Sequence, residues 1–178
     1  MDTCIRGTVP KIYTKKGDKG MTSLYNGKRV GKNNYIVHTL GKLDEFNVRI
    51  GAIKILLGNE TDIYKQLEEV QHNSMRMSSV IATPGSKKIE IKDDLEKKLE
   101  DLINYYSSKL PPLRNFVLPG GNETSIRAHF ARVQARECER FISGLHEPNP
   151  KIQKYFNRMS DYLFVLARWF SKNDDIHK

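Results

Sequence analysis

Residues 152–171 read IQKYFNRMSDYLFVLARWFS, the most apolar helical stretch of the chain. Large apolar side chains recur in it at steps of three and four residues, the spacing that places side chains on one face of an α-helix. They are Phe156, Met159, Leu163, Leu166, Trp169 and Phe170. This face is too apolar to be left in water, so we expect the helix in the centre of a bundle or, in part, at a subunit contact.

The same spacing predicts four further helices upstream, over about residues 35–57, 62–82, 93–107 and 122–143. Glycine or proline residues end most of these segments, as expected at helix boundaries. Five helices joined mainly by short breaks predict an all-α fold, an antiparallel five-helix bundle.

The length of 178 residues fits a single domain, 1–178. Within it we expect a loose N-terminus (1–10), an irregular loop (11–34) and the helical bundle (35–171). Short extended pieces are expected in the loop around Ile12–Tyr13 and Ser23–Tyr25.

Positive charge is concentrated near the N-terminus. The net charge is +9, and residues 11–32 hold seven Lys or Arg residues against one acid, Asp18, which is +6 of that total. A patch this compact favours a local site for a charged small molecule such as a nucleoside triphosphate over a long nucleic-acid track. A basic helical module that binds nucleic acid is the alternative.

Several classes of protein are disfavoured. No apolar run approaches the roughly 20 residues that span a bilayer, and no signal peptide is evident, so a cytoplasmic protein without a membrane partner is expected. Cys4 and Cys138 are expected as reduced thiols. The five histidines are scattered without the spacing of a zinc site, so no protein-held metal site is predicted.

The helix over 122–143 carries a charged stripe. Arg132, Arg136, Glu139 and Arg140 stand at i, i+4, i+7 and i+8 and share one side. The apolar residues Ile126, Phe130, Val133 and Phe141 cluster on another side. The stripe is either a solvated face with Glu–Arg pairing along the helix or a clamp for phosphate, to which Arg presents a planar fork. Asp44 is a candidate partner for one of the arginines.

Residues 14–23 read TKKGDKGMTS and combine glycine, hydroxyl and lysine side chains. Such a loop can bind anions through its backbone N–H groups, but it matches neither GxxxxGK[ST] nor GxGxxG, and a surface hairpin explains it equally well. Asn157 and Asp161 stand one turn apart at the start of an otherwise apolar helix, where a half-exposed polar pair is the simplest interpretation. Phe116 is either a core residue or, near the Pro-Gly-Gly turn, part of a pocket wall.

Several separated motifs, in order, resemble the PduO-type cobalamin adenosyltransferases over nearly the full length. They are KIYTKKGDKG (11–20), GKLDEFN (41–47), FVLPGG (116–121), Arg132 to Arg140, and YFNRMSD (155–161) continuing to Arg168.

The resemblance implies ATP:cob(I)alamin adenosyltransferase activity in a homotrimer whose active sites lie between subunits. It implies that the loop 11–34 wraps around MgATP, that the stripe contacts the triphosphate or its Mg²⁺, and that Asn157 meets the nucleoside. Asp44 would pair with Arg132 across the subunit contact, and Phe116 would press on the lower face of the corrin. The implied site comprises Arg132, Asp44 and Phe116 as catalytic residues, with Thr14, Lys15, Lys16, Gly17, Thr22, Ser23, Lys32, Arg136, Glu137, Glu139, Arg140 and Asn157 as ligand-binding residues.

Two positions depart from the family pattern. Glu137 stands where a second consecutive arginine is usual, which alters the local charge, and Gly31 replaces a proline before Lys32. The substrates implied are MgATP and cob(I)alamin, and the further partners are a reductase and an adenosylcobalamin-dependent enzyme. A corrinoid carrier or chaperone that has lost catalysis is the alternative within the same family.

Overall fold

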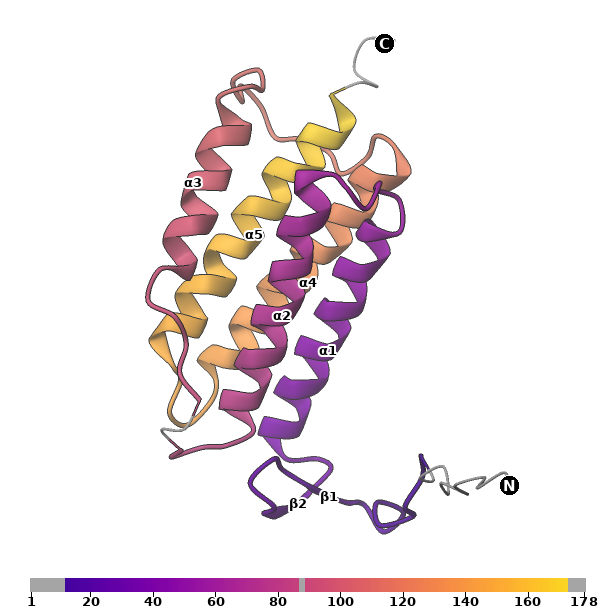
Figure 1. Ribbon diagram of the computed structural model, residues 1–178, viewed down its shortest axis with the longest axis vertical. Coiled ribbons are helices and arrows are strands. Elements are labelled where there is room, and N and C mark those ends of the chain that lie inside the picture. Colours follow the sequence, from indigo (N-terminus) through magenta and orange to yellow (C-terminus); the bar gives the residue numbers. More distant parts are fainter. Residues whose placement is uncertain (1–11, 87–88, 173–178) are drawn as a thin grey trace, which may run out of the picture.

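The computed structural model describes residues 12–86 and 89–172, and the expected loose N-terminus (1–10) lies outside this range. Five helices form a bundle, and a two-stranded hairpin lies below it (Figure 1). The elements are β1 (Met21–Ser23), β2 (Arg29–Gly31), α1 (Tyr35–Lys54), α2 (Asp62–Ile81), α3 (Leu95–Ser107), α4 (Glu123–Ser143) and α5 (Pro150–Ser171). The predicted all-α five-helix bundle is confirmed.

The helices begin where polar side chains cap them. Asn34, Thr61, Asn122 and Asn149 each accept a hydrogen bond from a backbone N–H in the first turn of α1, α2, α4 and α5. Such caps satisfy N–H groups that have no partner within the helix. The charged and functional residues on these helices therefore have a defined register from the first turn.

Helix α5 lies in the centre of the bundle. It packs against α4 on one side and α3 on the other, while α1 packs against α4 and α2. Most of α5 is buried, including Phe156, Met159, Leu163 and Leu166, while Asn157 and Asp161 lie on its exposed side. Of the two positions expected for this helix, the structure shows the central one.

Neighbouring helices run antiparallel except α3 and α5, which run in the same direction (Figure 1). The connection over residues 108–122 crosses the top of the bundle from the end of α3 to the start of α4. This crossing brings Phe116 to the end of the bundle where α4 begins.

The large apolar side chains that cluster on one side of α4 do not form its buried side. Phe130 and Val133 are each 54% exposed, and the buried apolar side consists mainly of small residues. It comprises Ala128, Ala131, Ala135, Cys138 and Ile142. Small side chains let α4 approach both α5 and α1 closely, so the bulky residues lie outside the contact.

Smaller differences occur at element ends. α1 ends at Lys54 instead of running to Gly58, because Leu56 and Leu57 bond to carbonyls three residues back, which tightens the last turn. α3 begins at Leu95, not Asp93. No strand forms at Ile12–Tyr13; instead β1 pairs antiparallel with β2 around a turn at Gly27, whose φ is 83°.

No helix among the described residues combines the length and the apolarity needed to cross a membrane. The cytoplasmic location remains a prediction from the sequence.

Candidate functional site

The charged stripe of α4 faces away from the core. Arg136 and Arg140 are exposed, and Arg132 is half-buried. None of these arginines forms an ion pair with a carboxylate in residues 12–86 or 89–172, and Glu139 bonds to Asn157 on α5 instead of to a neighbouring arginine. The Glu–Arg pairing along the helix that would explain a solvated face is therefore absent from the described residues. Three unpaired guanidiniums on one side of a helix suit an anionic ligand.

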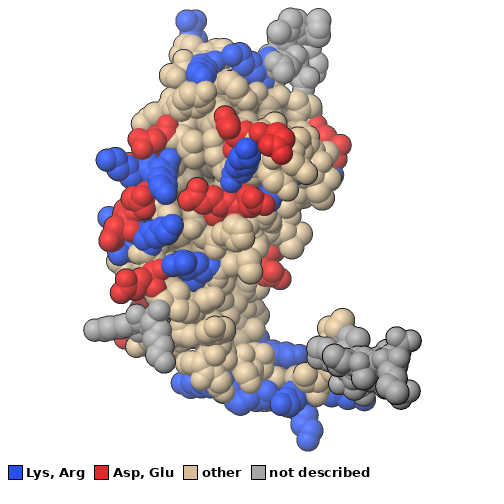
Figure 2. Space-filling model, viewed as in Figure 1, with Lys and Arg blue, Asp and Glu red and all other residues tan. Residues whose placement is uncertain are grey.

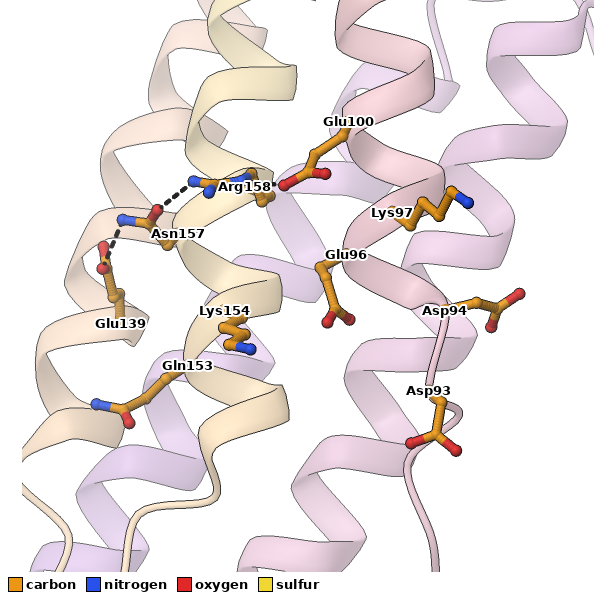
Figure 3. Close-up of a pocket in the computed structure, with 10 residues that line it drawn as sticks. All are labelled: Asp93, Asp94, Glu96, Lys97, Glu100, Glu139, Gln153, Lys154, Asn157 and Arg158. Atoms are coloured by element: carbon orange, nitrogen blue, oxygen red, sulfur yellow. Dashed lines mark hydrogen bonds and ion pairs between the residues drawn. The ribbon is translucent and has the colours of Figure 1, made fainter.

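Asn157 connects the stripe to α5. Its Nδ2 donates to Glu139 Oε1 at 2.9 Å, and its Oδ1 accepts from Arg158 Nη1 at 2.7 Å. Asn157 and Glu139 line a groove of about 820 Å³ that opens beside α3 (Figure 3). Partial burial raises the pKa of Asp161, one turn further on, while the positive charges of Arg158 and Arg136 oppose that shift. Asn157, Asp161, Arg136 and Glu139 therefore form one polar cluster between α4 and α5.

A second pocket, of about 710 Å³, brings Phe116 and Arg132 together. The connection before α4 supplies one wall, and α4 and α5 supply the other. Its lining residues are Leu113, Arg114, Asn115, Phe116, Val117, Pro119, His129, Arg132 and Phe164. The Phe116 ring is fully exposed in the single chain. An exposed phenyl ring at a pocket mouth is available to contact a flat apolar ligand.

His129 lies one turn before Arg132 and is buried. Burial, with a smaller effect of the Arg132 charge, lowers the pKa of His129, so the imidazole is neutral near pH 7. His129 Nδ1 and Arg132 Nε are buried and have no hydrogen-bond partner among the described residues. The sequence reasoning missed His129, although its i, i+3 spacing from Arg132 is visible in the sequence.

Asp44 is exposed on α1 and forms no ion pair with residues 12–86 or 89–172. The structure does not bring it to Arg132 within one chain. Its pairing with Arg132 of a neighbouring subunit stays a prediction.

Glu137 points away from the arginine stripe. It lies 3.2 Å from Lys42 on α1, and this hydrogen bond is the main cause of the raised pKa of Lys42. Lys42 also pairs with Glu45 at 3.5 Å, and Glu45 accepts from Arg49 at 2.7 Å. The departure from the family pattern thus forms a charge network between α1 and α4, and a contact of Glu137 with nucleotide remains untested.

The basic N-terminal residues form an arm that packs little against the helices. Within it, Arg29 Nη2 donates to the Lys16 carbonyl at 3.0 Å, and a Cβ atom on Gly17 would lie 3.3 Å from Lys32 Nζ. The structure therefore places Lys16, Gly17 and Lys32 close together in the arm. Contact of the predicted arm residues with nucleotide stays a prediction; these residues are Thr14, Lys15, Lys16, Gly17, Thr22, Ser23 and Lys32.

The arm projects from the lower end of the bundle, on the side away from α3 (Figure 1). Figure 2 shows Lys and Arg gathered along the arm, whereas Lys and Arg alternate with Asp and Glu on the visible face of the helices. This interleaving offers no continuous basic track on that face.

The comparisons with known proteins agree with this architecture. The family model described as "Cobalamin adenosyltransferase" matches residues 12–170. Corrinoid adenosyltransferase MMAB of Mus musculus is 36% identical over 172 residues, covering 90% of this chain and 73% of that protein. Corrinoid adenosyltransferase PduO of Salmonella typhimurium is 35% identical over 174 residues, covering 94% of this chain and 51% of that protein.

A solved structure of a variant PduO-type ATP:corrinoid adenosyltransferase from Lactobacillus reuteri, complexed with cobalamin and ATP, has a TM-score of 0.86 to this chain. The two share 32% sequence identity, and the match covers 93% of each chain. Because the family model spans nearly the whole sequence and the fold agrees, this chain belongs to the cobalamin adenosyltransferase family.

Proposed function

We propose that this protein transfers the 5′-deoxyadenosyl group of ATP to the cobalt of cob(I)alamin, producing adenosylcobalamin and triphosphate. The observation that carries the proposal is the pocket shared by Phe116 and Arg132, with the arginine stripe continuing from it along α4. One end of this surface suits a flat apolar ring system, and the other suits a polyanion. Family membership and the solved relative with cobalamin and ATP support the same assignment.

The corrinoid is assigned to the Phe116 pocket. The phenyl ring would lie against the lower face of the corrin and exclude water and the nucleotide base from the lower axial position of cobalt. Removing that ligand makes four-coordinate Co(II) easier to reduce to Co(I). The full exposure of Phe116 in one chain is consistent with a ring that contacts a ligand instead of the core.

The triphosphate is assigned to Arg132, Arg136 and Arg140, with Glu139 and Asn157 beside it. The basic arm would close over the nucleotide from a neighbouring subunit, since the arm packs little against the helices of its own chain. A homotrimer with sites between subunits meets this requirement. In it, the exposed Asp44 carboxylate would pair with Arg132, the half-buried arginine.

Mg²⁺ is expected to accompany the nucleotide. No group of three or more His, Cys, Asp or Glu side chains in the described part of the chain is arranged to hold a metal. Mg²⁺ is commonly bound through substrate phosphates with one or two carboxylates and water. Glu139 is the carboxylate of the stripe, and the ion would neutralise charge on the triphosphate.

In the reaction, the Co(I) electron pair attacks C5′ of ATP. The cobalt–carbon bond forms, the C5′–O bond breaks, and triphosphate leaves with the electron pair. Cobalt is itself the nucleophile, so the protein needs no Ser, Cys or general base. Its tasks are to align cobalt with C5′ and to stabilise the departing triphosphate with Arg and Lys side chains.

An anaerobic assay with chemically reduced cob(I)alamin and MgATP tests this function. We expect ATP-dependent conversion of the corrinoid spectrum to that of adenosylcobalamin. Binding of both substrates without a cobalt–carbon bond would instead identify a corrinoid carrier. Binding of nucleic acid that depends steeply on salt and is unaffected by ATP would favour the nucleic-acid module.

A further inference from the structure

Four side chains from three helices form a continuous hydrogen-bonded chain at the edge of the groove (Figure 3). Glu100 on α3 accepts from Arg158 Nε at 2.7 Å, and Arg158 Nη1 donates to Asn157 Oδ1 at 2.7 Å. Asn157 Nδ2 then donates to Glu139 Oε1 on α4 at 2.9 Å. The chain therefore runs from α3 across α5 to the stripe on α4.

This arrangement determines the orientation of the Asn157 amide. The amide has an acceptor end and a donor end, and each end faces a group that only that end can satisfy. A flipped amide would place its N–H₂ against a guanidinium and its carbonyl against a carboxylate. Arg158 thus keeps the amide N–H₂ of Asn157 directed at Glu139.

We propose that Arg158, anchored by Glu100, is a positioning residue that orients Asn157 and Glu139 for the nucleotide. This inference rests on the proposed function, because it assigns the nucleoside end of ATP to Asn157. It also gives a role to Glu100, one of the charged side chains on α3.

Arginine suits this role better than lysine. The planar guanidinium presents Nε and Nη1 in fixed directions, so one side chain holds Glu100 and Asn157 at the same time. A lysine ammonium keeps the charge but has no fixed fork to hold the two acceptors in these directions.

The Arg158–Glu100 ion pair contributes little to the stability of the fold. The Arg158 and Glu100 side chains are 40% and 46% exposed. Ion pairs at that exposure contribute little to folding, because water screens them. Breaking the pair should therefore leave the fold intact and change only what Asn157 does.

The test is steady-state cob(I)alamin adenosylation with each substrate varied in turn, together with calorimetric ATP binding. We expect Glu100→Ala to raise the KM and the Kd for ATP by about threefold to tenfold, the scale of one hydrogen bond. The corrinoid KM and kcat should stay unchanged. Glu100→Gln, which keeps a weaker acceptor, should fall between Glu100→Ala and the wild type, and Arg158→Lys should resemble Glu100→Ala.

Glu96→Ala is the matched control. Glu96 lines the same groove one turn earlier on α3 and forms no ion pair within 4.0 Å in the described residues, so its removal deletes the same charge without touching the chain of bonds. We expect ATP parameters like those of the wild type. In an Asn157→Ala background, Glu100→Ala should add no further change, because its effect passes through Asn157.

Equal ATP parameters for Glu100→Ala and Glu96→Ala would overturn the inference, as would an undiminished effect of Glu100→Ala when Asn157 is absent. A protein that binds ATP with the expected dependence on Glu100 but forms no cobalt–carbon bond would refute the proposed catalysis and support the positioning role. A wild-type protein that binds no ATP would overturn both.

Discussion

Arg132→Ala removes the residue that lines the Phe116 pocket and begins the arginine stripe. Arg132 has no ion pair with a described carboxylate, and its buried Nε has no hydrogen-bond partner there. If the guanidinium contacts the triphosphate, its deletion removes a charge-assisted contact worth about 1.5–3 kcal/mol. At 1.36 kcal/mol for each factor of ten, kcat/KM for ATP should fall by about 10- to 150-fold.

The free energy of unfolding should change by less than about 1 kcal/mol, since no ion pair within the described part of the chain is lost. The proposed Asp44–Arg132 pair across the subunit contact would be lost too, but a pair with an exposed carboxylate is worth about 1 kcal/mol or less. Deleting one of three neighbouring guanidiniums also relieves repulsion of a few tenths of a kcal/mol. We therefore expect a folded protein that keeps the proposed trimer and a normal Tm but has impaired turnover. The measurements are the anaerobic spectral assay, thermal unfolding and sedimentation.

Arg127→Ala is the control on the same helix. Arg127 Nε donates to Glu123 Oε1 at 3.0 Å, and this exposed i, i+4 pair should be worth a few tenths of a kcal/mol and nothing to turnover. Arg132→Lys tests the charge separately from the geometry, because lysine keeps the positive charge but lacks the planar guanidinium. Near wild-type activity of Arg132→Ala would refute the phosphate assignment. If the variant lost both activity and the proposed trimer, Arg132 would be required for subunit assembly instead of for phosphate binding.

Three further predictions follow from single contacts. Phe116→Ala should slow adenosylation of Co(II) substrate with a reductase while ATP binding and Tm stay constant, because the exposed ring has no packing to lose; equal losses in both assays would contradict this role. The pKa of His129 is lowered, mainly by burial, so unfolding takes up a proton and stability falls as pH drops through the ordinary histidine value of about 6.5. His129→Gln should flatten the dependence of Tm on pH between about 7.5 and 5.5, and an unchanged slope would exclude His129 as its source. Gly144→Ala would place a Cβ 2.2 Å from Tyr35 Oη, so we expect a loss of about 1–3 kcal/mol in unfolding free energy, and an unchanged Tm would show that Tyr35 moves freely.

Helix positions were accessible from the sequence because apolar spacing reports on them directly. The start of α5 at an Asn-Pro pair and the end of α2 before a Pro-Gly turn are local signals. The buried side of α4 was not accessible in this way, because its contacts use Ala and Cys, whose small side chains give a weak apolar signal beside Phe130 and Val133. The larger residues on α4 are more conspicuous in sequence, but close helix packing excludes them.

Some features of the candidate site could likewise be predicted from the sequence, and others depend on the tertiary structure. The arginine stripe is a helical repeat within one segment, so the sequence showed it, and the likeness of several ordered motifs to one family indicated the substrates. The joining of Phe116 to Arg132 in one pocket depends on the connection over residues 108–122 crossing the bundle.

The sequence by itself therefore determined the helices, the charged stripe and the family, because each is encoded in residues close together along the chain. Only the tertiary structure decided that Glu137 faces Lys42 and that Arg158 joins Glu100 to Asn157. It also showed that the arm projects from the lower end of the bundle and packs little against the helices. These facts depend on how helices distant in sequence pack against one another, and packing is set by side-chain size and shape over the whole core.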